Sequence, residues 1–146
     1  MDRDKIIDAM QEKTLEIYNA NEGYQANGKR GMMVAQVRSE RHPDRWESTI
    51  LAFGELSSGP RLQDGYPIST GMSFDTTIHE KIAYTRRTGK SSGAPFFEVV
   101  GTESYWKGAV ISDDGSCICA FSGFAGEDDV LIAEAGIAMY KSMKST

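Results

Sequence analysis

Hydrophobic residues recur at helical spacing in separate segments of the chain. The first segment covers residues 2–20, the second runs from a cap at Ser73 or Asp75 to about residue 88, and the third begins near Gly126. Apolar positions three or four residues apart form one stripe along a helix, so each segment is predicted to be an amphipathic helix. The predicted inner stripes are Ile6, Met10, Thr14 and Ile17 in the first helix, Ile78, Ile82 and Thr85 in the second, and Val130, Ala133, Ile137 and Tyr140 in the third.

Two apolar runs towards the C-terminal end flank a turn signal. Residues 106–111 and 117–124 enclose the dipeptide Asp114-Gly115. Asp-Gly tolerates the positive φ angles of a type I′ turn, so the pattern predicts a β-hairpin. A glycine-rich break then ends the second strand, and the acids at 127–129 place negative charge where a helix exposes unpaired N–H groups. A strand, a turn, a strand and a helix are therefore expected in one continuous stretch.

Shorter apolar runs elsewhere predict three more strands. Residues 32–37 and 48–53 should pair as an antiparallel hairpin, and residues 96–100 form a further short strand. Residues 54–72 contain Gly-Pro, Asp-Gly and Tyr-Pro pairs, so they are expected to be irregular, and loops of that length are often functional. The order helix, two strands, helix, three strands, helix predicts an α+β domain with a five-stranded, mostly antiparallel sheet.

Composition restricts the class of protein further. The 146 residues suit a single domain spanning 1–146, and 40% hydrophobic with 25% charged residues is typical of a globular chain. A net charge of −5 argues against nucleic acid as the main partner, because phosphate binding needs a concentrated basic face. No apolar run approaches the roughly 20 residues that span a bilayer, and the charged N-terminus lacks a signal-peptide core. We therefore expect a cytosolic protein with no membrane partner.

Motifs of known chemistry are incomplete in this chain. Gly89-Lys90-Ser91 lacks the earlier glycine of a phosphate-binding loop, since Tyr84 stands at that position. His79-Glu80 begins like a zinc-protease helix, but Ala83 replaces the second histidine. His79 is thus either an ordinary helix residue or a haem or metal ligand. The uninterrupted basic group Arg86, Arg87 and Lys90 is either a solvated helix end or an anion site.

The two cysteines and the acidic cluster have simple structural explanations. Cys117 and Cys119 alternate with Ile118 along the last predicted strand, so both thiols should point with Phe121 into a packed core face. The acids at 127–129 could serve acid–base chemistry in a cleft, but stabilisation of a helix start by its dipole is the simpler interpretation.

With these elements in place, the chain resembles the GlcG/HbpS-like family of haem-degrading or haem-binding domains. The chain departs from the family pattern where Tyr105-Trp106-Lys107-Gly108 replaces a Gly-Gly-x-Pro sequence, and where the last strand carries cysteines. The matching motifs are a lysine-led middle helix (Lys81 to Gly89), a strand from Gly108 to Ser112, the Asp114-Gly115 turn, Phe121-Ser122-Gly123, the acidic loop Glu127 to Asp129, and the Ala-rich helix from Ala133 to Ala138.

The resemblance implies a profilin-like fold and a homo-oligomer. Our leading hypothesis is an oligomeric, cytosolic small-molecule-binding domain that binds haem or a related tetrapyrrole, with His79 as an iron ligand and Tyr84, Tyr105 and Trp106 as aromatic contacts. A second hypothesis is an enzyme acting on a small anionic metabolite bound by the basic group at 86–90. A third is a non-catalytic structural or adaptor protein whose exposed aromatics form an oligomer interface.

Overall fold

The computed structural model describes residues 2–23, 30–59, 61–69, 71–93, 99–104 and 106–145. The chain is an α+β domain, as its pattern of elements predicted. In chain order the elements are α1 (Arg3–Ala20), β1 (Arg30–Arg38), β2 (Trp46–Gly54), β3 (Arg61–Gln63), β4 (Tyr66–Ser69), α3 (Phe74–Thr88), β5 (Ala109–Ile111), β6 (Cys117–Ser122) and α4 (Gly126–Lys144).

The helix boundaries follow local capping chemistry. The Asp2 side chain accepts a hydrogen bond from the Lys5 N–H and begins α1, and Ser73 accepts one from the Thr76 N–H and begins α3. Gly89, with φ 69°, ends α3 in the left-handed conformation that favours glycine. The cap at Ser73 and the stop at Gly89 confirm the sequence prediction. Within the described parts of the chain, no helix is both long and apolar enough to cross a membrane.

β1 and β6 form the centre of a four-stranded antiparallel sheet. Its strand order is β2-β1-β6-β5, so the two predicted hairpins, β1–β2 and β5–β6, meet where β1 pairs with β6. In this register Val34 lies opposite Ile50 on one side and Ala120 on the other. Nearly all of β1 and all of β6 are buried, because both faces of the sheet are covered.

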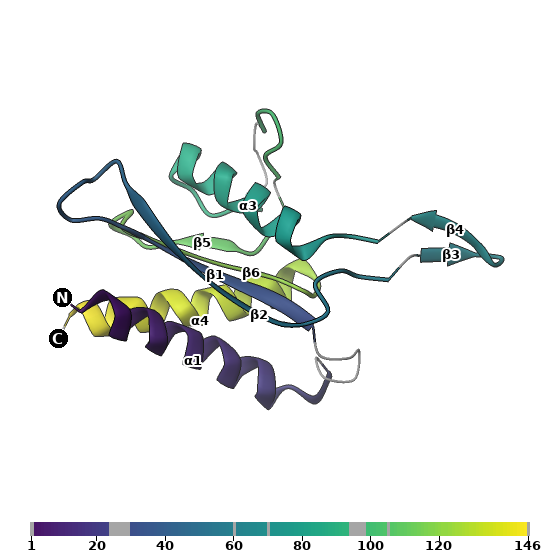
Figure 1. The fold of residues 1–146 in the computed structure, drawn as a ribbon, viewed down its shortest axis with the longest axis horizontal. Coiled ribbons are helices and arrows are strands. Elements are labelled where there is room, and N and C mark those ends of the chain that lie inside the picture. Colours follow the sequence, from purple (N-terminus) through teal and green to yellow (C-terminus); the bar gives the residue numbers. More distant parts are fainter. Residues whose placement is uncertain are drawn as a thin grey trace.

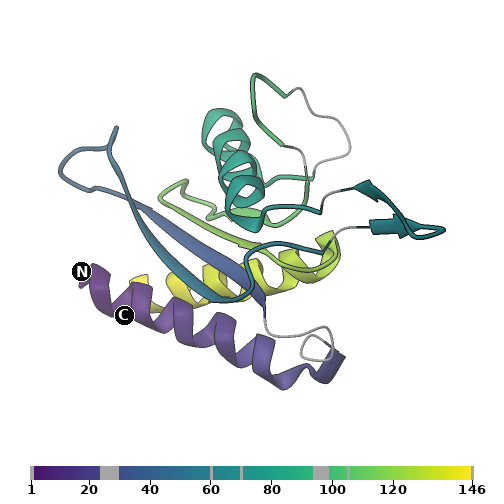
Figure 2. The ribbon, with the colours of Figure 1, turned by 45° about the vertical axis from the view of Figure 1, so that its right-hand side comes forward.

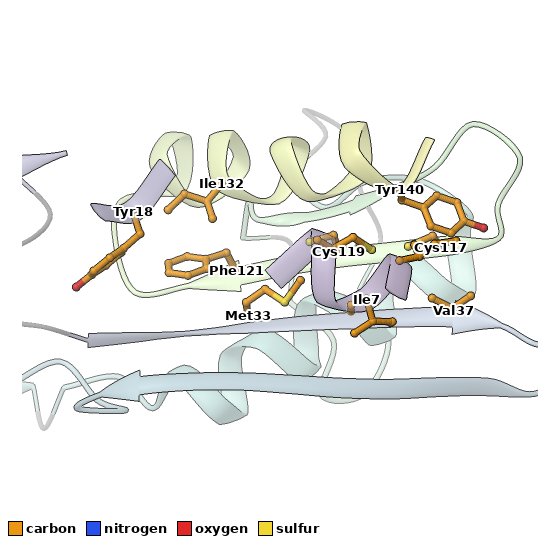
Figure 3. Packing of buried hydrophobic residues seen from close by; sticks show 12 residues of the cluster. Ile7, Tyr18, Met33, Val37, Cys117, Cys119, Phe121, Ile132 and Tyr140 are labelled. Carbon is orange, nitrogen blue, oxygen red and sulfur yellow. The ribbon is translucent and has the colours of Figure 1, made fainter. Parts of the chain in front are cut away.

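Helices lie on both faces of this sheet. α1 and α4 run side by side beneath it, and α3 lies on the opposite face (Figure 1, Figure 2). The larger core lies between α1, α4 and the sheet, where Cys117, Cys119 and Phe121 pack with Ile132 and Tyr140 (Figure 3). The prediction that both cysteines share a core face is therefore confirmed. A smaller core, with Met32, Val34, Ile78, Ile82, Ala109, Ile118 and Ala120, lies under α3.

The segment 54–72, expected to be irregular, contains a further hairpin. β3 and β4 pair through the two-residue turn Asp64-Gly65, in which φ is 52° and 81°. Both residues have positive φ, as a type I′ turn requires. The hairpin projects away from the rest of the domain (Figure 1, Figure 2), and we call residues 61–69 the arm.

The turn at Asp114-Gly115 differs from the predicted type I′ geometry. Gly115 has φ 73°, but Asp114 does not have a positive φ. The longer connection from Ile111 to Cys117 allows the Gly115 N–H to bond the Ser112 carbonyl at 2.9 Å, so a single glycine in the left-handed region is enough.

The predicted strand at 96–100 falls largely on residues 94–98, which lie outside the described part, as does Tyr105. Val99 and Val100 are not in a strand and are exposed. The main sheet, as described, has four strands.

Candidate functional site

A cavity of about 610 Å³ opens where α3, the end of β6 and the start of α4 meet. It lies beside the base of the arm, since Ser58 and Met72 also line it. The lining residues that bear on its chemistry are Arg30, Phe74, Lys81, Trp106, Asp128 and Asp129.

Lys81 places an amino group at the wall of this cavity. It lies on the inner stripe of α3, three residues after Ile78, and only 2% of it is exposed. Its Nζ donates to the Phe121 carbonyl at 3.1 Å, to Ser122 Oγ at 2.9 Å and to Asp129 Oδ2 at 3.2 Å. An ammonium has three N–H donors, and all of them are used here.

Asp129 lies in the first turns of α4 and is 3% exposed. Its Oδ2 accepts from Lys81, and its Oδ1 accepts the Phe124 N–H at 3.1 Å. Burial raises the pKa of Asp129 to about 7, although the Lys81 ammonium and the Phe124 N–H both favour the ionised form. Burial also lowers the pKa of Lys81. Burial therefore disfavours the charged form of both groups, and their mutual attraction opposes this effect.

Gly108 makes room for this pair just before β5 begins. A Cβ at this position would lie 2.7 Å from the Phe121 carbonyl oxygen, 2.8 Å from Lys81 Nζ and 2.9 Å from the Cβ of Asp129. Its φ of +127° is also a conformation that side chains disfavour. Only glycine fits between the sheet and the charged pair.

Arg30 contributes a second positive charge to the cavity. Its guanidinium carbon lies 5.7 Å from the centroid of the Phe74 ring. Its Nε is buried and has no hydrogen-bond partner within the part of the chain that the structure describes. A buried donor without an acceptor is costly, and a guanidinium at a cavity wall can bind an oxygen atom of a ligand.

Among the ligand-binding residues that the sequence predicted and the structure describes, Trp106 alone lines the cavity. Its side chain is half exposed and supplies an aromatic surface. Tyr84 is 2% exposed inside the fold. Lys90 is exposed beyond the end of α3, and its N–H bonds Thr88 Oγ1.

The predicted arginines are held by other groups. The guanidinium carbon of Arg86 lies 5.3 Å from the centroid of the Trp46 ring. The guanidinium carbon of Arg38 lies 4.8 Å from the same centroid. Arg87 pairs with Glu103 through Nε at 2.7 Å. The basic group at 86–90 is therefore not gathered around one ligand position, because its members contact different elements.

His79 lies on the solvent side of α3, away from this cavity. Its Nδ1 is 2.8 Å from the Asp75 carbonyl oxygen and 3.1 Å from Asp75 Oδ1. The depression beside it is lined by polar residues, including Glu80 and Thr102. Haem needs apolar walls for its ring faces, so the described surroundings of His79 do not fit haem. Among the described residues, no group of three or more histidine, cysteine or acidic side chains could hold a metal ion.

The cysteines do not offer reactive thiols. Burial raises the pKa of Cys119 to about 12 and raises that of Cys117 still further. The thiolate is the nucleophilic form, so both thiols are inert at neutral pH.

Sequence reasoning missed Lys81 as a site residue and assigned Asp129 to the helix dipole. One signal could have found them. Lys81 stands between Ile78 and Thr85 on the inner stripe of its helix, and Asp129 precedes Ile132 and Ala133 on theirs. A charged residue at a buried helical position needs a partner, and Lys81 and Asp129 are each other's partners.

The chain matches no family model, no curated protein and no solved structure.

Proposed function

We propose that this protein is a small-molecule-binding domain whose ligand occupies the cavity beside Lys81 and Asp129. The observation that carries the proposal is the buried charge pair at the wall of a cavity. Buried ion pairs are seldom a gain in stability over apolar residues of similar size, because desolvation offsets their attraction. Perturbed ionisable groups in a cleft are more common at functional sites.

The lining suggests the chemical class of the ligand. Arg30 offers a guanidinium that suits a carboxylate, and Phe74 and Trp106 offer aromatic surfaces. Asp128 and Asp129 are acidic residues of the same lining, which disfavours a compound carrying several negative charges. A small monocarboxylate with an apolar portion and a further polar group meets these conditions.

A thermal-shift screen of small mono- and dicarboxylates tests this proposal. A ligand at 100 times its Kd stabilises the native state by about 2.7 kcal/mol, so a monocarboxylate should raise Tm measurably. Arg30→Gln should abolish the shift. Arg38→Gln is the matched control, because Arg38 stacks on Trp46 and does not line the cavity. The proposal is wrong if no carboxylate shifts Tm, or if the shift survives Arg30→Gln.

A haem titration separates the cavity from the site implied by the family resemblance. If the ligand binds in the cavity, His79→Ala should not remove any Soret shift that haem produces. A saturable shift that is lost in His79→Ala would overturn the cavity proposal in favour of a haem site on α3.

Self-association through the arm is part of the same proposal. Leu62, Tyr66 and Ile68 are 61%, 75% and 58% exposed. A two-stranded hairpin alone is marginal in water, so a second copy covering these side chains would stabilise it. Light scattering should show an oligomer that Tyr66→Lys reduces to a monomer, and a monomeric wild-type protein would refute this. The profilin-like arrangement, with a fifth strand at 96–100, and a cytosolic location remain proposals from the sequence.

A further inference from the structure

Asp129 is held by two hydrogen bonds from the described part of the chain. A carboxylate has about four acceptor positions; Oδ1 accepts from the Phe124 N–H and Oδ2 accepts from Lys81 Nζ. The residue also lines the cavity. A compound bound in the cavity would lie beside a carboxylate that is held in position from two sides.

Lys81 is poorly arranged to act as a nucleophile. The Phe121 carbonyl, Ser122 Oγ and Asp129 occupy the three directions around Nζ that Cε does not. A lone pair on this nitrogen has no free direction towards a carbonyl carbon. The ammonium is instead a fixed positive charge beside Asp129, which makes Lys81 a positioning residue.

We propose that Asp129 is a catalytic base that removes a proton from the carbon next to the carbonyl group of a small oxo acid. This inference rests on the proposed function, since Arg30 would bind the carboxylate of the same compound. The substrate class is a 2- or 3-oxo monocarboxylate, and the reaction is its keto–enol tautomerisation.

The step balances without a co-reactant. The C–H bond breaks and its proton forms an O–H bond on Asp129, while the C–H electron pair becomes the C=C bond of an enolate. The carbonyl π electrons move to oxygen, and the positive charge of Lys81 stabilises the negative charge that develops there. Return of the proton to the enolate oxygen gives the enol, and its return to carbon restores the oxo acid. Nothing is oxidised or reduced.

The surroundings of Asp129 suit this role. Lys81 faces it from α3, the Phe124 N–H faces it from the segment before α4, and Asp128 is its acidic neighbour on α4. A base works best when its pKa lies near the operating pH. Burial brings the pKa of Asp129 to about 7, well above the ordinary value of 3.8. The exchange rate should therefore rise with pH and level off above about 7.

Hydrogen–deuterium exchange in D₂O, followed by proton NMR, tests the inference with pyruvate, 2-oxobutanoate and acetoacetate as probes. At least one probe should lose its α-protons faster than in buffer alone. Asp129→Asn should lower the catalysed rate by about 100-fold or more. Asp113→Asn is the matched control, because Asp113 is an exposed aspartate that does not line this cavity, and it should leave the rate unchanged.

The outcomes separate this inference from the proposed function. If the probes raise Tm through Arg30 but none exchanges faster than in buffer, the catalytic inference is wrong and the binding proposal stands. If no carboxylate binds and none exchanges, both are wrong. Where Asp129→Asn fails to fold, the pH profile of the wild-type protein still tests the inference. A catalysed rate that does not change between pH 3 and pH 9 excludes a carboxylate base such as Asp129.

Discussion

Replacing Lys81 with methionine should destabilise the fold severely, and more so at high pH than at low pH. Methionine keeps most of the aliphatic volume, so the change isolates the ammonium. Its loss removes the donor from the Phe121 carbonyl, from Ser122 Oγ and from Asp129 Oδ2. Ser122 Oγ and Asp129 Oδ2 each lose the buried bond that Lys81 makes to them.

The expected loss follows from the kind of interaction. Removing one partner of a buried ion pair costs about 3–5 kcal/mol, and a stranded neutral acceptor costs about 1–3 kcal/mol. Asp129 limits the total because it can take up a proton. We therefore expect Lys81→Met to cost about 3–5 kcal/mol at pH 8, which corresponds to roughly 12–20 °C in Tm for a domain of this size.

The sign of the pH dependence can be worked out from Asp129. Its pKa is raised from 3.8 to about 7 in the folded protein, and without the ammonium it should rise further. A carboxyl group whose folded pKa is raised reduces stability as pH climbs from its unfolded value to its folded value. The free energy lost by Lys81→Met should therefore be smaller at pH 5 than at pH 8.

Urea unfolding at pH 5 and pH 8 measures this prediction. The double variant Lys81→Met/Asp129→Leu should recover much of the loss, because it leaves no buried charge. Lys13→Met serves as a control, since its partner Glu16 is an exposed neighbour on the same helix and the pair should be worth less than about 1 kcal/mol. A loss below about 1 kcal/mol for Lys81→Met, or an equal loss at both pH values, would refute the reasoning.

Three further predictions use the same unfolding measurement. Gly108→Ala should lower the free energy of unfolding by about 3 kcal/mol or more, because its Cβ would clash with the charged pair. Gly115→Ala has open space around it and should cost only about 1 kcal/mol, so equal losses would contradict this. Gly136→Ala should lower the free energy of unfolding by about 1–3 kcal/mol, since its Cβ would lie 2.5 Å from Cys119 Sγ. Adding Cys119→Ala should relieve part of that loss, and strictly additive losses in the double variant would count against the contact. Asp114→Asn should lower the free energy of unfolding by at most about 1 kcal/mol at pH 7, because Lys144 lowers the pKa of this half-exposed carboxyl. The loss should vanish as pH falls below the ordinary aspartate range, and a loss that persists at low pH would contradict this.

The elements that the sequence predicted correctly are those with local signals. The helices carry an inner stripe and, in α3, a serine cap and a glycine stop. The arm was missed because β3 and β4 are very short and Leu62, Tyr66 and Ile68 remain exposed, so no alternation of buried and exposed positions marks them. Even so, Asp64-Gly65 is the same turn signal that predicted a hairpin at Asp114-Gly115. Asp64-Gly65 has the type I′ geometry, whereas Asp114-Gly115 does not.

The site could be predicted far less well, because its chemistry arises from tertiary contacts. Lys81 and Asp129 are 48 residues apart in the chain, and each looks like an ordinary helix residue until α3 and α4 are placed around the sheet. His79 was predicted as a ligand from its residue type, but its side chain on α3 faces solvent. Lys81, two residues later, faces inward. The direction of a side chain on its helix, rather than its residue type, decides which group reaches the cavity.

The position of the pair also explains why fold and site share residues here. α3 and α4 lie on opposite faces of the sheet (Figure 1), so their side chains can meet only past the end of a strand. β6 ends at Ser122 and β5 begins at Ala109, and Lys81 crosses to Asp129 at that edge, beside the side-chain-free Gly108. The cavity opens at the same edge, because the sheet no longer separates the two helices there. A ligand bound in it would contact both helical layers at once, so ligand affinity and the stability of this junction should depend on the same few residues.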